Sequence, residues 1–361
     1  MDDKLRFASG RWRSVLATAL VLSCLLGSCS RDRSSADARW YRGNTHAHTE
    51  LCGHADSTPT EVVRWYRDHG YDFLVLSEHN LLIAPAEVKA PPGGLGKLLL
   101  IPGEELTGAK DVIGVNLPKV LRIRTKGLPT TEGVRMQVDA VLAAGGLPIV
   151  AHPASSKLAA QDLLPVGAFS LLEIHNAHHR DLRPAEAKRW SEELWDELLS
   201  TGRVIYGVAT DDSHQLKASE LAHPARPGRA WVMVRAEALS PGAITDALRR
   251  GDFYGSTGVI LTTVSTEGGS YRVAVDVERT REQASASQWV GRAGDAGPPW
   301  EIRFIGPGGR VVHRAMATTA SYPITKEHSY LRCKVSYRLR GEGGTKIFHA
   351  WTQPVFTDGR R

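Results

Sequence analysis

Cysteine is scarce in this chain: only four of its 361 residues are cysteines, at positions 24, 29, 52 and 333. So few thiols exclude the disulfide framework that holds small secreted domains together. A chain of this length can bury a core large enough to fold without one. The net charge of +6 is also a weak excess, so nucleic acid is an unlikely partner.

Two common catalytic signatures are missing as well. The sequence has no Gly-x-Ser-x-Gly motif, which is the turn that presents the nucleophilic serine of many hydrolases. The segment Pro92-Gly-Gly-Leu-Gly-Lys looks like a phosphate-binding loop, but the leading glycine and the closing serine or threonine of that motif are absent. We therefore reject the phosphate-binding loop, and the missing serine motif is consistent with a hydrolase that needs no protein nucleophile.

The N-terminal apolar stretch, from Val15 to Leu26, is shorter than the roughly 20 residues that span a bilayer comfortably. It follows four basic residues, and this order is typical of an export signal. It ends in Leu26-Gly27-Ser28-Cys29, which resembles the lipobox of bacterial lipoproteins. We expect a lipoprotein signal peptide over 1–28 and lipidation of Cys29, with an ordinary cleaved signal as the alternative.

The expected location follows from this leader. Residues 29–39 hold no large apolar side chain before Trp40, so we interpret them as a flexible tether between the lipid and the folded domain. The resulting protein is exported and anchored to a membrane of the cell envelope. Ser30 after Cys29 resembles the signal for sorting to the outer membrane, facing the periplasm, if the cell has two membranes.

The region from Trp40 to residue 262 alternates strand-like apolar runs with helical patterns, which favours an α/β fold of βα units. The runs are continuous, as in parallel strands covered on both faces, and lie at 72–76, 97–101, 147–151, 170–174 and 203–209. Helices are expected to begin at Thr58-Pro59, near Gly133, near Glu186 and at Ser240-Pro241. Residues 263–361 alternate apolar and polar side chains instead, which predicts a small all-β domain, most simply a sandwich.

Histidines and carboxylates cluster at the carboxyl ends of the predicted strands. In a barrel of parallel strands these ends converge on one face, and so many imidazoles and carboxylates there would repel or stay unsatisfied without a cation. Zn²⁺, Mn²⁺ or Fe²⁺ accepts such a mixed set of nitrogen and oxygen ligands. The residues concerned are His46, His48, Glu78, His79, Glu104, Glu105, His152, His175, Asp211, Asp212 and His214.

Five motifs in order carry a family resemblance: Asn44-Thr-His-Ala-His-Thr, Ser77-Glu-His-Asn, Pro102-Gly-Glu-Glu, Val150-Ala-His-Pro and Thr210-Asp-Asp-Ser-His. Together they resemble the PHP (polymerase and histidinol phosphatase) superfamily. The later segments Gly228-Arg-Ala-Trp and Ala350-Trp-Thr-Gln-Pro-Val-Phe resemble its carbaryl-hydrolase-like (CehA/McbA) branch. The resemblance implies a distorted, TIM-like seven-stranded β/α barrel over 40–262, with two or three bound metals, that hydrolyses phosphoesters.

The resemblance also implies roles for individual residues. His46, His48, Glu105 and Asp212 would hold one metal, and Glu105 would bridge to a second metal that His152 also binds. A third metal would be bound by His54, His79 and His214. Glu105, Asp212 and His214 are the expected catalytic residues.

The sequence departs from the family pattern at the second metal. The usual histidine between the Glu105 and His152 motifs is missing, because Asp111-Val-Ile-Gly-Val-Asn contains none, and occupancy of that site stays open. We prefer His54 to Asp56 and Glu105 to Glu104, by their spacing from neighbouring motifs. Arg180 and Arg183 are candidates to bind an anionic substrate group, with a solvated basic loop as the alternative.

Three functions remain after this reading. The first is an envelope-anchored phosphoesterase, in which a water shared by two cations loses its proton near neutral pH and attacks the small-molecule substrate. The second is cleavage of a carboxylic or carbamic ester on the same scaffold. The third is a non-catalytic lipoprotein that retains metal and binds a partner. The sequence does not indicate an oligomeric state.

The lipoprotein interpretation predicts that Cys29→Ala abolishes membrane anchoring, because one short apolar leader cannot otherwise hold a folded domain at a bilayer. Detergent phase partitioning of the wild type and the variant measures this, with Cys24→Ala as the matched control that should partition like the wild type. Equal partitioning of Cys29→Ala and wild type into detergent would refute the prediction.

Overall fold

The computed structural model describes residues 38–179, 191–219, 223–286, 291–292, 299–341 and 344–360. Residues Asp37–Arg361 form one compact unit. The predicted signal peptide, Cys29, Arg180 and Arg183 lie outside the described residues. The predicted boundary between residues 262 and 263 stays a prediction.

Strands dominate the described part of the chain. In order they are β1 (Arg39–Asn44), β2 (Phe73–Leu76), β3 (Leu99–Leu106), β4 (Val112–Val115), β5 (Leu147–Val150), β6 (Leu171–Asn176), β7 (Tyr206–Thr210), β8 (Trp231–Ala236), β9 (Phe253–Ser256), β10 (Leu261–Ser265), β11 (Ser270–Val275), β12 (Gly291–Arg292), β13 (Trp300–Gly306), β14 (Arg310–Ala315), β15 (Thr319–Pro323), β16 (Tyr330–Gly341), β17 (Gly344–Thr352) and β18 (Val355–Phe356). The helices are α1 (Pro59–Asp68), α2 (Thr130–Ala143), α3 (Ala160–Leu163), α4 (Ser191–Ser200), α5 (Pro241–Arg250) and α6 (Val277–Ala286).

The helix caps predicted from the sequence are present at the start of α1 and α5. Thr58 and Glu61 form the reciprocal capping box at the start of α1, with Pro59 at the first helical position. The Ser240 hydroxyl accepts a hydrogen bond from the Ala243 amide at the start of α5, and Gly251 ends that helix in the left-handed conformation. Each of the five predicted strand runs is confirmed, as β2, β3, β5, β6 and β7.

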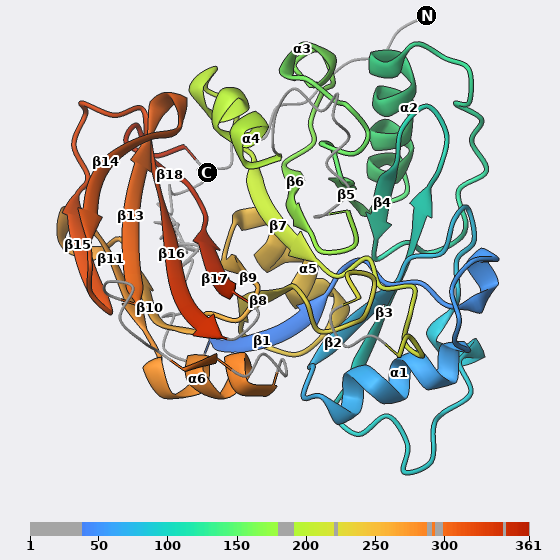
Figure 1. Ribbon diagram of the computed structural model, residues 1–361. Coiled ribbons are helices and arrows are strands. Elements are labelled where there is room, and N and C mark those ends of the chain that lie inside the picture. Colours follow the sequence, from blue (N-terminus) through green and yellow to red (C-terminus); the bar gives the residue numbers. More distant parts are fainter. Residues whose placement is uncertain are drawn as a thin grey trace, which may run out of the picture. The chain divides into compact units, whose positions relative to one another are not determined.

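The main sheet is mixed rather than parallel throughout (Figure 1). Strands β1, β2 and β3 pair in parallel, as do β5, β6 and β7. Between these blocks β4 runs antiparallel to both β3 and β5. On the other side of β1 the sheet continues through β8, β9, β17, β16, β13 and β14. The carboxyl ends of the two parallel blocks and the start of β4 therefore meet at one edge.

A closed seven-stranded barrel is not found among the described strands. β7 passes close to β9, since a Cβ added at Gly255 would lie 2.9 Å from the Cβ of Ala209, but no ladder joins the two strands in the described part of the chain. The side chain of Gln353 takes the place of a neighbouring strand. Its Oε1 accepts from the Gly207 amide at 2.7 Å, and its Nε2 donates to the Gly207 carbonyl at 2.9 Å. These bonds satisfy the β7 backbone without closing the sheet.

The region after Thr263 forms strands in the predicted places and contains one helix that was not predicted. β10, β11 and β15 make a separate three-stranded sheet, and Tyr271 of this sheet is buried in the same apolar cluster as Phe304 of β13. The expectation of an all-β region was wrong at α6, because residues 277–286 are rich in Glu, Arg, Gln and Ala, which favour a helix.

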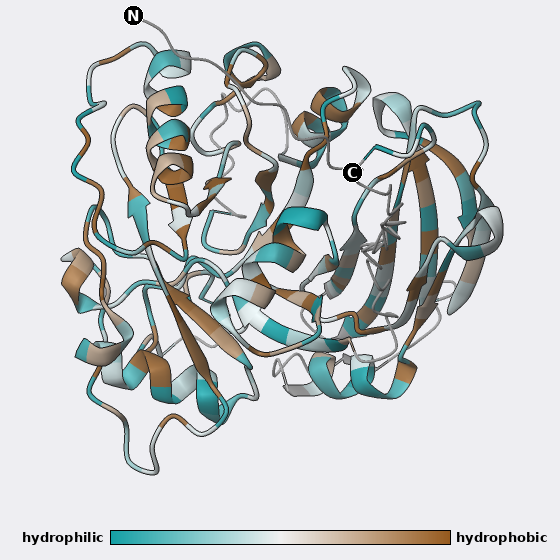
Figure 2. Cartoon of the chain, turned by 180° about the vertical axis from the view of Figure 1, so that it is seen from behind, coloured by the Kyte–Doolittle hydropathy of each residue, from teal (hydrophilic) through white to brown (hydrophobic). Residues whose placement is uncertain are grey.

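Hydropathy separates the two ends of the main sheet (Figure 2). Strands β2 and β5 of the parallel blocks are apolar along their length, whereas the C-terminal strands alternate in colour, as expected for sheets with one solvated face. Among the described residues, no helix combines the length and apolarity needed to cross a membrane.

A buried ion pair ties α4 to β16. The guanidinium of Arg332, 1% exposed, donates to Asp196 through Nε at 2.7 Å and through Nη2 at 2.5 Å. Its Nη1 reaches Glu192 at 3.0 Å, and the Tyr330 hydroxyl also donates to Asp196. Burial raises the pKa of Glu192, but Arg332 and Lys334 lower it more, to about 2. The pair is fully satisfied, so loss of either partner would leave a buried charge alone.

We therefore predict that Arg332→Ala lowers the free energy of unfolding by about 3–5 kcal/mol. The control is Arg250→Ala, which removes a pair with Asp252 whose side chains are 57% and 39% exposed, and should cost less than about 1 kcal/mol. Urea unfolding of the three proteins measures both values. Equal losses for the two variants would show that the buried pair is no more important than a surface pair.

Candidate metal centre

Many side chains that bear nitrogen or oxygen gather where the parallel blocks end. His46 and His48 follow β1, and His79 follows β2 and forms an isolated bridge with Glu105 in β3. The remaining side chains follow β5, β6 and β7 or precede β4: Asp111, His152, His178, His179 and Asp212. The strand ends of the open sheet thus bring the possible ligands together, as the face of the predicted barrel was expected to do.

At the centre lies a cage of four ligand atoms, which we call the four-atom cage: His46 Nε2, His48 Nε2, Glu105 Oε2 and Asp212 Oδ1. The two imidazole nitrogens are 3.0 Å apart. Each nitrogen is 3.4 Å from Glu105 Oε2 and 3.2 or 3.3 Å from Asp212 Oδ1. Four ligands held tetrahedrally at 2.0–2.1 Å from Zn²⁺ are separated by about 3.3–3.4 Å. The five distances are therefore close to the edges of a tetrahedral metal site.

Charge in the cage is balanced between carboxylates and imidazoles. Burial lowers the pKa of His46, but Asp212, Glu173 and Glu105 raise it more, so this pKa lies well above its ordinary value. Burial raises the pKa of Glu105, but His46 and His152 lower it more, so that pKa lies well below its ordinary value. The buried carboxylates thus require positive charge nearby, which either protonated imidazoles or a divalent cation supplies.

Glu173, in the middle of β6, holds the cage in place. Its Oε1 accepts from His46 Nδ1 at 2.8 Å and from the Thr210 hydroxyl at 2.9 Å. Its Oε2 accepts from the His152 amide at 2.7 Å and from Asn176 Nδ2 at 2.9 Å. A carboxylate on Nδ1 leaves Nε2 of His46 free to bind a metal, which is the usual arrangement behind metal-binding histidines. Sequence reasoning missed Glu173, although a charged residue inside a buried apolar run was a signal.

His214 is prepared as a ligand in the same manner. Its Nδ1 donates to the Asp212 carbonyl at 3.0 Å, while its buried Nε2 has no hydrogen-bond partner among the described residues. Burial and the neighbouring His48 lower the pKa of His214 to about 3. A neutral imidazole with an unsatisfied, buried lone pair fits a cation.

His54, His79 and His214, the residues predicted for a third metal, are divided between two possible ligand groups that share His214. His48, His79 and His214 each offer an atom within 4.8 Å of the others, and Cys52, His54 and His214 form a second such group. His54 is exposed and its ring stacks 4.5 Å from that of His214. Cys52 is partly buried, and its sulfur lies 3.6 Å from His54 Nδ1.

The preferences for Glu105 over Glu104 and for His54 over Asp56 can be compared with the structure. Glu105 lies in the cage, whereas Glu104 turns away and accepts from the Leu121 amide at 2.5 Å. Asp211 likewise turns away and binds the amides of residues 228–230 and the Tyr66 hydroxyl. Asp56 caps the amides of Leu216 and Lys217 instead of facing the cage. The predicted roles of Glu105, Asp212 and His54 stay predictions, but their placement fits them.

The predicted second metal site, for which the sequence lacks the usual histidine, lies next to the other carboxylate oxygen of Glu105, Oε1. Glu105 Oε1 is 3.0 Å from His152 Nε2, and Asp111 Oδ2 is 3.7 Å from the same nitrogen. His179 Nε2 lies 3.3 Å from Asp212 Oδ2, and His152, His179 and Asp212 form another possible ligand group. Neither Asp111 nor His179 was predicted as a ligand. His175, at the end of a predicted strand, lies elsewhere and stacks on Trp351 at 5.2 Å.

Two of the five described non-glycine residues with a positive φ belong to this site. His152 and Asp212 have φ values of 26° and 51°, in the left-handed region that side chains other than glycine rarely adopt. Such conformations cost about 1–3 kcal/mol each and persist where the surroundings enforce them. Here hydrogen bonds to Glu173 and from Asn176 hold the two residues, which aims both side chains at the cage.

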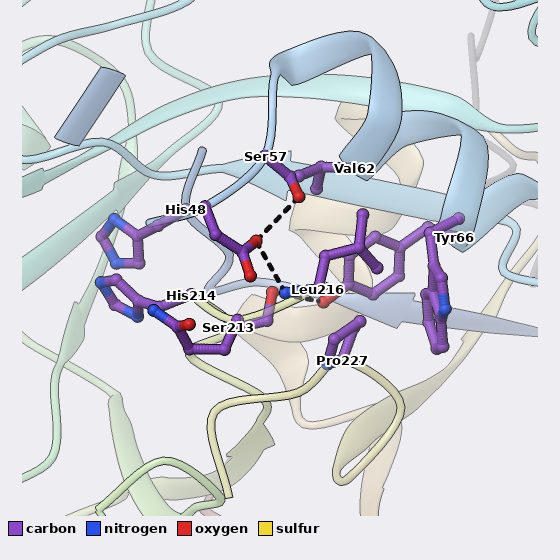
Figure 3. Close-up of a pocket in the computed structure, with 11 residues that line it drawn as sticks. His48, Ser57, Val62, Tyr66, Ser213, His214, Leu216 and Pro227 are labelled. Carbon is purple, nitrogen blue, oxygen red and sulfur yellow. Dashed lines mark hydrogen bonds between the residues drawn. The ribbon is translucent and has the colours of Figure 1, made fainter. Parts of the chain in front are cut away.

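A small pocket adjoins the cage beneath α1 (Figure 3). His48 and His214 lie side by side at one end, and Tyr66 and Pro227 lie at the other. The Tyr66 hydroxyl and the Ser213 hydroxyl are 3.0 Å apart across its floor. Its walls join α1 to the segment that follows Asp212, so the helix helps to position the site.

Three solved structures are similar to parts of this chain. A two-domain protein from Bacteroides vulgatus that contains a predicted PHP-like metal-dependent phosphoesterase is 13% identical, with 88% of each chain covered and a TM-score of 0.44. A proposed metal-dependent phosphoesterase from Bifidobacterium adolescentis is 14% identical over 48% of this chain and 87% of that one, with a TM-score of 0.33. A Chromobacterium violaceum amidohydrolase with bound sulfate and no metal is 12% identical over 48% and 88%, with a TM-score of 0.30.

No protein-family model matches the sequence. No curated protein sequence matches it either. At these identities and TM-scores the three structures do not place the chain in a family, so its function has to be inferred from its own residues.

Proposed function

We propose that this chain is a metal-dependent hydrolase of the PHP type that cleaves phosphoesters of small molecules. The observation that carries the proposal is the four-atom cage, whose five measured edges are 3.0–3.4 Å. Its members are the residues that the motif resemblance assigns to the first metal. The resemblance also supports phosphoesters as the substrate class.

The donor set fits two or three divalent ions. Zn²⁺, Mn²⁺ and Fe²⁺ take the combination of imidazole and carboxylate that His46, His48, Glu105 and Asp212 offer. Glu105 presents Oε2 to the cage and Oε1 to His152, so it can serve both sides. Bound cations would supply an acidified water and a positive charge for the developing oxyanion.

The chain's own residues determine how substrate approaches. The side chains of His46, His48 and Asp212 are at most 3% exposed, whereas His79, His178 and His179 are 24–28% exposed. The cage is therefore reached from the side of these three imidazoles. Glu173 and Asn176 keep the buried ligands fixed while substrate binds and leaves.

Anchoring through Cys29 is part of the proposal. The motif at residues 26–29 and the basic leader support it. The lipid would hold the domain at the surface of a membrane of the cell envelope, with residues 29–39 as the tether.

We predict that Glu105→Gln and Asp212→Asn lose metal content and phosphoesterase turnover together. Each substitution keeps the side-chain shape but removes a charge that the cage needs to hold a cation. Elemental analysis and aryl-phosphate hydrolysis on the full-length proteins measure both properties, and the wild type should hold at least two metal equivalents. Competition between phosphate and carbamate esters in one preparation distinguishes the two ester classes.

The matched control is Asp139→Asn, the same type of substitution on the exposed face of α2, which should retain wild-type metal and turnover. Wild-type turnover in Glu105→Gln would remove this residue from the site. Less than one metal equivalent in the wild type after growth in metal-rich medium would contradict the whole proposal.

A further inference from the structure

Asp111 occupies a position that the strand register brings to the cage. It directly precedes β4, which runs antiparallel to β5 with Val112 opposite Val150. The Ala151 amide donates to the Asp111 carbonyl at 3.1 Å, so Asp111 and His152 lie next to each other at the same edge. An antiparallel strand thus begins where the parallel strands end.

Possible ligand atoms lie close to Asp111. His152 Nε2 lies 3.0 Å from Glu105 Oε1 and 3.7 Å from Asp111 Oδ2. The other ring nitrogen of His152 lies 3.2 Å from the Ser156 hydroxyl, which leaves Nε2 directed at the two carboxylates. The His179 ring stands 4.6 Å from that of His152, so a further imidazole is within reach.

We propose that Asp111 is a ligand of a second divalent cation, held by Glu105 Oε1, His152 Nε2 and Asp111 Oδ2 next to the four-atom cage. The proposal rests on the proposed function, since Glu105 would be shared with the cation in the cage. The carboxylate of Asp111 then takes the place of the histidine that the motif lacks, and the chain keeps its second metal site.

A carboxylate at this position changes which cation the second site prefers. Carboxylate oxygens suit Mn²⁺ and Mg²⁺, whereas imidazole favours Zn²⁺. With two carboxylates and one imidazole as its nearest ligands, the site accepts Mn²⁺ more readily than it would with a histidine at residue 111. The group around His214, with imidazoles and the Cys52 sulfur, is softer and suits Zn²⁺.

The test is titration of chelator-stripped, full-length protein with Mn²⁺, with free Mn²⁺ followed by electron paramagnetic resonance. Asp111→Asn should bind one equivalent fewer than the wild type, or bind it at least about tenfold more weakly. Asp139→Asn should match the wild type. An unchanged stoichiometry and affinity in Asp111→Asn would overturn the proposal.

Asp111→His is the second variant, which restores an imidazole ligand and keeps the proposal testable if Asp111→Asn fails to fold. It should retain the equivalent while its preference shifts from Mn²⁺ toward Zn²⁺ in direct competition. The same preference as in the wild type would mean that residue 111 does not touch the cation. Asp212→Asn separates the two proposals: if it binds Mn²⁺ like the wild type while Asp111→Asn does not, the cage fails and the second site stands.

Discussion

The close approach of His46 Nε2 and His48 Nε2, 3.0 Å apart and buried between two carboxylates, is the constraint on which the rest of the site depends. Two imidazole lone pairs at this distance repel unless a proton or a cation lies between them. Hydrogen bonds to Glu173 and the Asn44 side chain fix His46 from behind. The surrounding hydrogen bonds thus hold the possible ligand atoms close together, and a metal site needs this preorganisation before it binds its metal.

The mixed sheet explains how so many ligands reach one edge. The parallel strands have their carboxyl ends at this place, and the antiparallel β4 has its amino end there. The side chain of Gln353 pairs with the amide and carbonyl of Gly207 in β7. The strained φ values occur at His152 and Asp212, which directly follow β5 and β7 at these strand ends.

Much of this arrangement could be predicted from the sequence, because it depends on local patterns. Apolar runs defined β2, β3, β5, β6 and β7, and the polar residues at or after the ends of these runs include two members of the cage, Glu105 and Asp212. Caps at Thr58 and Ser240 placed two helices correctly. These features need only neighbouring residues, so no knowledge of the fold was required.

The features that sequence reasoning missed depend on tertiary pairing. Asp111 becomes relevant only once β4 is known to run antiparallel, and Glu173 only once β6 is known to lie under His46. The barrel was expected from the family resemblance, whereas in the structure the side chain of Gln353, 146 residues away in the sequence, bonds to the backbone of Gly207 in β7. Helix α6 was missed because the alternating pattern of the surrounding strands decided the prediction, although the composition of residues 277–286 favours a helix.

Anomalous X-ray diffraction from crystals grown with Zn²⁺ tests the central claim most directly. We expect a strong peak inside the cage, about 2.0–2.2 Å from His46 Nε2, His48 Nε2, Glu105 Oε2 and Asp212 Oδ1. A cage without a peak, while zinc binds only at Cys52, His54 and His214, would contradict the claim that these four atoms form the metal site of a hydrolase.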